Sequence, residues 1–316
     1  MKVLVTGGAG FIGSHVCEKL LARGDEVVVL DNFNDFYDPR IKRRNAALLG
    51  RAKVVEGDLR DRELVASLFA KERFDALVHL AAMAGVRPSL LDPLHYVDVN
   101  LRGTMILLEE LRKAPQTRFV FASSSSVYGA NDRVPFKESD DIPHPVSPYA
   151  STKRAGELFA WTHHHLYGIP TTCLRFFTVY GPRQRPEMAI AKFVKAIDEG
   201  KAIPFFGDGS TRRDYTYVDD IVDGVVRSLD RCQGYEIYNL GESATTSLGE
   251  LVDLIGKAVG REPILDRQPL QPGDVLITYA DVTKAKEKLG YRPTTPIADG
   301  LVRYVAWYRA TGGGVR

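Results

Sequence analysis

The sequence has little cysteine, no long hydrophobic run and almost no excess charge of either sign. Its 316 residues include three cysteines, Cys17, Cys173 and Cys232, which are far apart and lack the spacing of metal ligands. We therefore expect buried, reduced thiols in a cytoplasmic protein. The apolar start is far too short for a signal peptide, and no stretch reaches the length of a membrane span.

Positive and negative side chains are nearly balanced. Forty-two lysines and arginines against 40 acidic residues leave a formal charge of +2. This balance gives no reason to expect nucleic acid or a membrane as the partner. Three consecutive histidines at 163–165 lie inside a helical pattern, where neighbouring positions point in different directions. We therefore predict no metal site.

Apolar runs alternate with amphipathic stretches over the first two-thirds of the chain. Short, nearly all-apolar runs predict strands at residues 2–6, 26–30, 52–56, 76–80, 118–123 and 171–176. Helical patterns between them include residues 13–22, 62–71, 97–113 and 149–167. Strands buried on both faces are typical of a parallel sheet covered by helices. The fold class is therefore α/β, a doubly wound Rossmann sheet with ligands at the carboxyl ends of its strands.

After residue 176, loops rich in proline, glycine and arginine separate shorter elements. Helices are expected at residues 187–199, 219–230, 248–259 and 282–289. We therefore predict a first domain over residues 1–176 and a smaller α/β domain over most of residues 177–316. The smaller domain should be discontinuous, because a segment near residues 214–240 returns to the first domain and ends in a strand-like run at Tyr238.

A glycine-rich loop, residues 7–13, joins the first predicted strand to the first predicted helix. Gly7 permits the tight turn, Gly10 lets the backbone approach a pyrophosphate, and Gly13 lets helix and sheet pack closely. The helix N-terminus then favours an anion through its free N–H groups and its dipole. The spacing is GxxGxxG, so the glycines by themselves also suit a purely structural turn.

Asp31, at the end of the second predicted strand, makes this loop a predicted NAD site. A carboxylate there can accept both ribose hydroxyls and repel a 2′-phosphate, which favours NAD over NADP. Residues after the third and fourth strands are expected near the adenine and the ribose. The set expected to bind NAD is Gly7, Gly10, Phe11, Ile12, Gly13, Asp31, Asn32, Asp58, Leu59, Leu80, Ala81 and Ala82.

Tyr149 and Lys153 lie four residues apart and share one face of a predicted helix. A tyrosine, with a pKa of about 10, is a poor base at neutral pH. A neighbouring ammonium, together with a nicotinamide cation, would stabilise its phenolate, and the lysine would also suit the nicotinamide ribose. Such pairs are common on ordinary helices. The serine-rich segment at 123–129 favours the catalytic interpretation, because a serine there can bond the reacting hydroxyl.

Over nearly its full length the sequence resembles the extended short-chain dehydrogenase/reductase family. The resemblance is carried by residues 6–13, 58–59, 79–82 and 123–129, by Asn100 and by the Tyr149/Lys153 pair. It implies a tyrosine-based hydride-transfer enzyme that acts on a nucleotide sugar. It also implies that Ser124 is the catalytic serine and that Asn100 braces the active-site helix. Asn100, Ser123, Tyr149, Lys153 and Phe177 thereby join the expected NAD-binding residues, with Phe177 near the nicotinamide.

Within that family the sequence is most similar to UDP-glucuronate 4-epimerases, through residues 34–39, 84–87, 175–182, 185–189 and 271–274. The resemblance implies NAD-dependent epimerisation of UDP-glucuronate to UDP-galacturonate through a 4-keto intermediate, with Tyr149 as the base. UDP-glucose 4-epimerases typically have asparagine where this chain has Thr178. Dehydratases and decarboxylases carry an acid in the segment of Ser125 and Ser126, which disfavours elimination and decarboxylation.

The resemblance also implies a set of substrate-binding residues. Arg185 would hold the sugar carboxylate together with Thr178 and Ser125, because guanidinium binds carboxylate bidentately. Arg87 is a second candidate for this role. The remaining residues expected to bind the UDP-sugar are Ser124 at the hydroxyl, Arg213 at the diphosphate, Asp274 at the ribose and Lys192 near the uracil.

Three other functions stay open on the sequence. A UDP-glucose/galactose 4-epimerase would run the same chemistry on a neutral hexose, and a UDP-glucuronate decarboxylase would release carbon dioxide. A non-catalytic NAD-binding sensor would usually have lost the Tyr149/Lys153 pair, which this chain keeps. The family resemblance further implies a homodimer through residues 97–113 and 149–167, although their apolar content equally suits packing within one chain.

Overall fold

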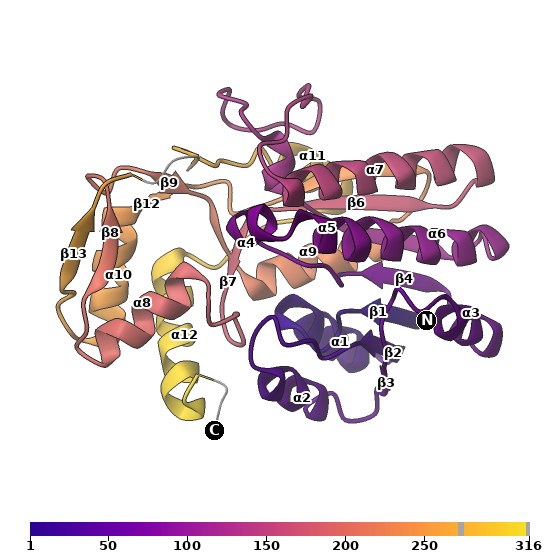
Figure 1. The fold of residues 1–316 in the computed structure, drawn as a ribbon, viewed down its shortest axis with the longest axis horizontal. Helices are drawn as coiled ribbons and strands as arrows, with labels where there is room; N and C mark the ends of the chain where they lie inside the picture. Colours follow the sequence, from indigo (N-terminus) through magenta and orange to yellow (C-terminus); the bar gives the residue numbers. More distant parts are fainter. Residues whose placement is uncertain (271–274, 314–316) are drawn as a thin grey trace.

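A seven-stranded parallel sheet forms the centre of the computed structural model, which describes residues 1–270 and 275–313 (Figure 1). The strand order is β11-β6-β5-β4-β1-β2-β3, and every neighbouring pair is parallel. The predicted doubly wound sheet is therefore confirmed, with its switch point between β1 and β4. The strands are β1 Lys2–Thr6, β2 Glu26–Asp31, β3 Lys53–Glu56, β4 Ala76–His79, β5 Arg118–Ser124, β6 Thr171–Phe176 and β11 Tyr235–Leu240.

Helices cover both faces of this sheet, because successive strand residues point to opposite faces. In β1, Val3 and Val5 belong to one core and Leu4 to the other. The first core includes residues of α1 (Phe11–Arg23) and α9 (Val218–Asp230). The second is covered by α3 Arg62–Lys71, α6 Gly103–Lys113 and α7 Pro148–Tyr167. The three cysteines are buried, as predicted.

A second group of elements lies beside the carboxyl ends of the strands (Figure 1). Three short pairs, β7–β10, β9–β12 and β8–β13, organise it, and only β9–β12 is antiparallel among these described pairs. Its elements are β7 Thr178–Tyr180, α8 Ala189–Asp198, β8 Ile203–Phe206, β9 Arg212–Arg213, β10 Tyr215–Tyr217, β12 Thr246–Ser247, α10 Leu248–Val259, β13 Leu265–Gln268 and α12 Ile297–Thr311. The helix α11 Thr283–Leu289 instead packs against β11 of the central sheet and against α9.

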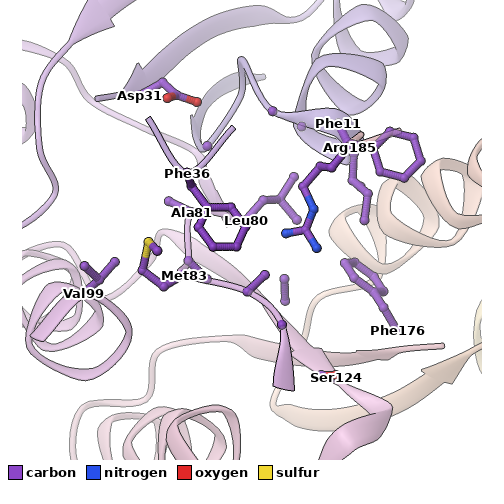
Figure 2. A pocket seen from close by; sticks show the side chains of 18 of the residues that line it. Phe11, Asp31, Phe36, Leu80, Ala81, Met83, Val99, Ser124, Phe176 and Arg185 are labelled. Atoms are coloured by element: carbon purple, nitrogen blue, oxygen red, sulfur yellow. The ribbon is translucent and has the colours of Figure 1, made fainter. Parts of the chain in front are cut away.

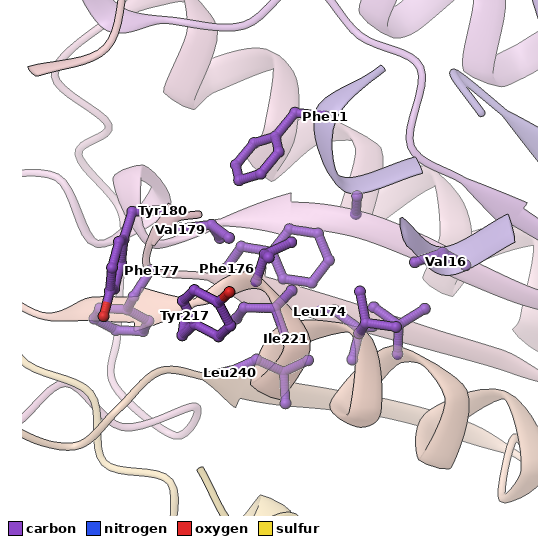
Figure 3. Packing of buried hydrophobic residues seen from close by; sticks show 14 of the residues in the cluster. Phe11, Val16, Leu174, Phe176, Phe177, Val179, Tyr180, Tyr217, Ile221 and Leu240 are labelled. Atoms are coloured by element: carbon purple, nitrogen blue, oxygen red, sulfur yellow. The ribbon is translucent and has the colours of Figure 1, made fainter. Parts of the chain in front are cut away.

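One hydrophobic core runs without interruption from the sheet into this second group. Figure 3 shows Leu174 of β6 and Ile221 of α9 near Leu240 of β11, and Tyr180 and Tyr217 beyond the strand ends. The chain enters the second group after β6 and returns to the sheet at β11. Tyr238 is paired with Leu174 there, so the predicted returning strand is present.

Several helices differ from the sequence prediction or were missed. The predicted helix at 97–113 is interrupted by a π-helical turn, Asp98–Arg102, which precedes α6. Short helices not predicted are α2 Pro39–Ala47, α4 Val86–Leu91, α5 Pro93–Val97 and the 3₁₀ turn Ser125–Tyr128. Among residues 1–270 and 275–313, no helix combines the length and the apolar character needed to cross a membrane.

Candidate active site

A cavity of about 440 Å³ opens at the carboxyl ends of the central strands. Figure 2 shows Asp31, Leu80, Ala81 and Ser124 around it, with the Arg185 side chain pointing into it. The site is thus located at the switch point of the sheet, where the fold class predicts a ligand. Predicted site residues that line the cavity are Gly7, Gly10, Phe11, Ile12, Gly13, Asp31, Asn32, Asp58, Leu59, Leu80, Ala81, Ala82, Ser123, Ser124, Ser125, Tyr149, Lys153, Phe177, Thr178 and Arg185.

The glycine loop has no room for side chains. A Cβ at Gly13 would lie 2.1 Å from the carbonyl oxygen of Gly7, and a Cβ at Gly7 would lie 2.8 Å from the backbone of Ala81. Gly7 also has a φ of 69°, which favours glycine. Within the described chain, no side chain caps the start of α1 at Gly10. The loop therefore lets the ligand approach the backbone, and the uncapped first turn of α1 presents its N–H groups to a pyrophosphate.

Asp31 holds the glycine loop and the next turn in place. Its Oδ2 accepts a hydrogen bond from the backbone N of Ala9 (3.1 Å), and its Oδ1 accepts one from the backbone N of Phe33 (2.9 Å). Burial raises the pKa of this carboxyl, and the charge of Lys42 opposes the rise. The carboxylate also lines the cavity, at the position where ribose hydroxyls are expected.

Asp58 is fixed by hydrogen bonds at the same end of the cavity. Asn32 Nδ2 donates to Asp58 Oδ2 (2.9 Å), and Arg60 donates from Nε to Oδ1 (2.9 Å) and from Nη2 to Oδ2 (2.8 Å). The hydrogen bonds from Arg60 hold the pKa of Asp58 well below its usual range. Asp58 is therefore a pre-oriented, ionised acceptor.

Ser124 and Tyr149 meet in the cavity because β5 ends beside the start of α7. Ser124 is the last residue of β5, and Tyr149 is the second residue of α7, which begins after the N-cap Ser147. Burial raises the pKa of Tyr149, whereas its hydrogen bond with Ser124 and the charge of Arg185 lower it. Tyr149 thus has a hydroxyl partner and a cation within electrostatic range.

Lys153 occupies the next turn of α7 and bonds the end of β5. Its Nζ donates to the carbonyl oxygen of Ala122 (2.7 Å) and lies 5.1 Å from the ring centroid of Phe121. Burial lowers the pKa of Lys153 to about 8. The sequence predicts that this ammonium stabilises the Tyr149 phenolate. In the structure, the cation that lowers the pKa of Tyr149 is Arg185.

Two predicted residues, Asn100 and Ser123, connect the cavity wall to the layers behind it. Asn100 Nδ2 donates to Thr152 Oγ1 of α7 (3.0 Å), and its side chain makes two further bonds to the backbone of Met83. Asn100 therefore joins the loop after β4 to α7. The hydroxyl of Ser123 donates to Glu157 Oε1 (2.6 Å), so its side chain points toward a buried carboxylate.

His79 supports the same region through two hydrogen bonds. In the sequence it stood out only as part of segment 79–82, which carries the family resemblance. Thr104 Oγ1 donates to the carbonyl oxygen of Asn100 (2.6 Å), so it accepts from Nε2 of His79 (2.9 Å). Thr6 Oγ1 then donates to Nδ1 (2.7 Å). Burial lowers the pKa of His79 to about 3, which keeps the ring neutral. Its role is to join β1, β4 and α6.

Arg185 enters the cavity from the loop that precedes α8. Its guanidinium carbon lies 5.7 Å from the ring centroid of Phe36, and its Nε lies 2.9 Å from Oε1 of Glu187. Ser125 and Thr178, the other residues expected at a carboxylate, line the same cavity. Phe36 comes from the loop after β2, so two segments far apart in the sequence meet here.

Three expected substrate residues lie outside the cavity that the described residues form. Arg87 is exposed on α4, with its guanidinium carbon 5.9 Å from the ring centroid of Phe206. Lys192 is exposed on α8, and Arg213 of β9 donates from Nη1 to the carbonyl oxygen of Arg212 (2.9 Å). Asp274 falls outside the described residues.

The cavity is also lined by residues that were not predicted from the sequence. They come mainly from the loops after β2 and β4, and the first of these loops falls in the family-like segment 34–39, which was the available signal. Lys42 lies there with its Nζ donating to the Asn34 side chain (2.7 Å). The additional residues include Asn34, Phe36, Tyr37, Lys42, Met83, Ala84, Gly85 and Met188.

Comparisons with known proteins show what the sequence and the fold resemble. A family model described as GDP-mannose 4,6 dehydratase matches residues 4–304. The chain is 45% identical to UDP-glucuronate 4-epimerase 4 of Arabidopsis thaliana, over 98% of this chain and 75% of that protein. A solved UDP-glucuronic acid 4-epimerase from Bacillus cereus, in complex with UDP-glucuronic acid and NAD, is 36% identical with a TM-score of 0.91, covering 98% of this chain and 99% of that one. A solved UDP-glucose 4-epimerase with UDP-glucose from Thermotoga maritima gives the same identity, TM-score and coverage.

Proposed function

The chain belongs to the extended short-chain dehydrogenase/reductase family, and we propose that it converts UDP-glucuronate to UDP-galacturonate by epimerisation at C4. It is an NAD-dependent nucleotide-sugar 4-epimerase, and hence an isomerase. The identity of the sugar and of the catalytic residues is what we propose. The proposed base is Tyr149. The observation that carries the choice of sugar is the Arg185 guanidinium in the cavity that also contains Tyr149 and Ser124.

The cavity has the features that NAD requires. The glycine loop leaves no space for a Cβ at Gly13, the start of α1 offers backbone N–H groups, and Asp31 presents a carboxylate beyond them. NAD held by these residues would supply a reversible hydride acceptor for C4 of the sugar. The NAD-binding residues are proposed to be those expected from the sequence that line the cavity.

Tyr149 is proposed to take the proton of the C4 hydroxyl and to return it at the end of the turnover. Ser124 bonds Tyr149 and would share the same sugar oxygen. Arg185 and Ser124 both favour the phenolate, so they would help Tyr149 to act at neutral pH. Lys153 would hold the nicotinamide ribose while it fixes α7 to β5 through Ala122.

A uronate poses a chemical problem that Arg185 is suited to solve. The 4-keto form of a glucuronate is a β-keto acid, which loses carbon dioxide when the bond to the carboxylate aligns with the ketone π system. A guanidinium can hold a carboxylate at two points and keep that bond out of alignment. Arg185, with Thr178 and Ser125 beside it, is proposed as this clamp. Ser125 also supplies no acid for elimination.

Product analysis tests the proposal directly. NAD-loaded protein would be incubated with UDP-glucuronate and, separately, with UDP-glucose, and the products followed by NMR. We expect UDP-galacturonate from the first reaction and at least tenfold slower turnover in the second, since a neutral hexose leaves Arg185 without its carboxylate. Formation of UDP-xylose would favour a decarboxylase, and turnover of UDP-glucose alone would reject the uronate.

The clamp has its own test in Arg185→Ala. This variant should weaken binding of UDP-glucuronate or release carbon dioxide during turnover, because the two hydroxyls of Thr178 and Ser125 cannot replace the charged, bidentate contact. The measurement is the ratio of carbon dioxide to UDP-galacturonate, together with KM. An unchanged ratio and an unchanged KM would remove Arg185 from the clamp. Tyr149→Phe is the matched control, since it should retain NAD and lose turnover of both sugars.

A further inference from the structure

Glu187 places a second carboxylate beside the arginine that the proposed function uses for substrate recognition. Glu187 Oε1 lies 2.9 Å from Nε of Arg185. Both carboxylate oxygens of Glu187 and the Nε of Arg185 are shielded from water, yet none of them has a hydrogen-bond partner within residues 1–270 and 275–313. The contact is therefore an ion pair with poor hydrogen-bond alignment, and it acts mainly through charge.

Arg185 can serve two carboxylates because its donors point in different directions. A guanidinium carries five N–H donors in a fixed fork, and Glu187 approaches the Nε side of that fork. The guanidinium itself lies in the cavity, with its carbon 5.7 Å from the centroid of the Phe36 ring (Figure 2). Its Nη groups are thus the ones proposed to bind the sugar carboxylate, while Glu187 stays on the opposite side.

Glu187 and Arg185 exert opposite electrostatic effects on the same part of the cavity. Both charges influence Tyr37 and Tyr96, where Arg185 lowers the pKa and Glu187 raises it. A uronate bound at Arg185 therefore also experiences the negative charge of Glu187. Repulsion between like charges weakens binding of an acid and leaves a neutral hexose unaffected.

We propose, on the basis of the proposed function, that Glu187 is a specificity-determining residue that moderates the affinity of Arg185 for acidic sugars. It balances the guanidinium when the cavity holds no carboxylate, and it limits how tightly a uronate is held. The second effect matters because substrate and product carry the same carboxylate. A site that binds both too tightly gains no rate from that binding and releases its product slowly.

Isosteric removal of the charge tests this inference. Glu187→Gln would be made in the Tyr149→Phe background, and binding of UDP-glucuronate and UDP-glucose to the NAD-loaded protein measured by calorimetry. We expect UDP-glucuronate to bind roughly three- to fivefold more tightly, with the affinity for UDP-glucose unchanged. A purely structural role for Glu187 would weaken both ligands. Unchanged, weakened or undetectable UDP-glucuronate binding in the variant would overturn the inference.

A matched control and a separate readout keep the two proposals apart. Glu18 of α1 forms an ion pair (2.7 Å) with Arg183, which lies in the same loop as Arg185. Glu18→Gln removes this carboxylate and should leave the affinities for both UDP-sugars unchanged. If Glu18→Gln had the effect of Glu187→Gln, general negative charge near this loop would be responsible, and the specific role of Glu187 would be overturned. The proposed function fails independently, when the wild-type protein leaves UDP-glucuronate unconverted, because the binding comparison needs no turnover.

Discussion

At the scale of one residue, burial of the Lys153 ammonium in the site lowers the unfolding free energy of the protein. Its side chain is 4% exposed, and burial lowers the pKa of its ammonium to about 8. The unfolded chain has the ordinary value of about 10.4, so the folded protein binds the proton less strongly. Below pH 8 the buried, charged Lys153 therefore lowers the unfolding free energy by its full amount. This destabilisation decreases as the pH rises from about 8 to 10.4.

The Lys153 penalty predicts a pH-dependent stability difference. Relative to a Lys153→Met variant, the wild-type protein should gain roughly 2.5 kcal/mol of unfolding free energy between pH 7 and pH 10. Urea denaturation of both proteins at the two pH values gives the measurement. The bond to Ala122 is absent from the variant at both pH values, so the change between the two pH values reports the protonation of Lys153. A difference that does not change with pH would contradict the assignment of a buried ammonium.

Single residues of the site could be predicted where the backbone pattern carried the information. The order of strand, loop and helix predicts the roles of Gly7, Gly13 and Asp31, and all three line the cavity. The meeting of Phe36 with Arg185 could not be predicted, because two loops 149 positions apart come together only when the sheet has formed. Glu187 lies only two residues after Arg185, but the sequence does not show that the two side chains form an ion pair.

At the scale of elements, α7 connects stability with activity. Its N-cap Ser147 accepts a hydrogen bond from the backbone N of Ala150 (3.1 Å), and Tyr149 lies between these two residues. Ser147→Ala should cost about 1 kcal/mol of unfolding free energy and should also lower kcat, because the first turn carries the proposed base. Urea denaturation and initial rates measure the two effects.

The cap of α10 offers the control for α7. Ser247 accepts from the backbone N of Glu250 (3.1 Å) in a capping box remote from the cavity lining. Ser247→Ala should cost a similar unfolding free energy and leave kcat unchanged. If both variants lost activity in proportion to stability, the position of Ser147 beside Tyr149 would have no special consequence.

The strands of the central sheet were predictable because each is short, apolar and flanked by loops. β1 and β6 have the predicted bounds, and β2, β3, β4 and β5 differ by one residue at an end. β11 begins at Tyr235, three residues before the strand-like run predicted at Tyr238. By contrast, α12 contains Gly300, which argues against a helix in the sequence. A Cβ there would lie 2.1 Å from the hydroxyl of Tyr180, so close tertiary packing explains the glycine. Pro204 similarly obscured the short strand β8.

At the scale of the whole molecule, the predicted homodimer remains to be tested. The proposed interface helix α7 exposes Leu158 to 50% and Leu166 to 60%. We expect the protein to sediment as a dimer, and Leu158→Glu combined with Leu166→Glu to halve its mass by placing charges in the contact. Val302→Glu, on an equally exposed residue (58%) of α12, is the control that should remain dimeric. A wild-type monomer would reject the interface.

The predicted division at residue 176 also stays a prediction, because the core crosses that point. Phe176, Phe177 and Val179 belong to one hydrophobic cluster with residues of α1 and α9. From the sequence, a change in loop composition indicated a boundary, but composition carries no information about which side chains pack together. Functional assignment of the two parts depends on the proposed site, which draws residues from both.

The place of β11 in the sheet has a consequence for how this protein is made. β11 covers the outer edge of β6, yet β7, α8, β8, β9, β10 and α9 are all translated between the two. While the ribosome adds these residues, the edge of β6 has no strand to pair with, and open strand edges promote aggregation. Any premature stop codon between positions 177 and 235 leaves a nascent chain with that edge exposed, a substrate for chaperones and proteases rather than a smaller enzyme.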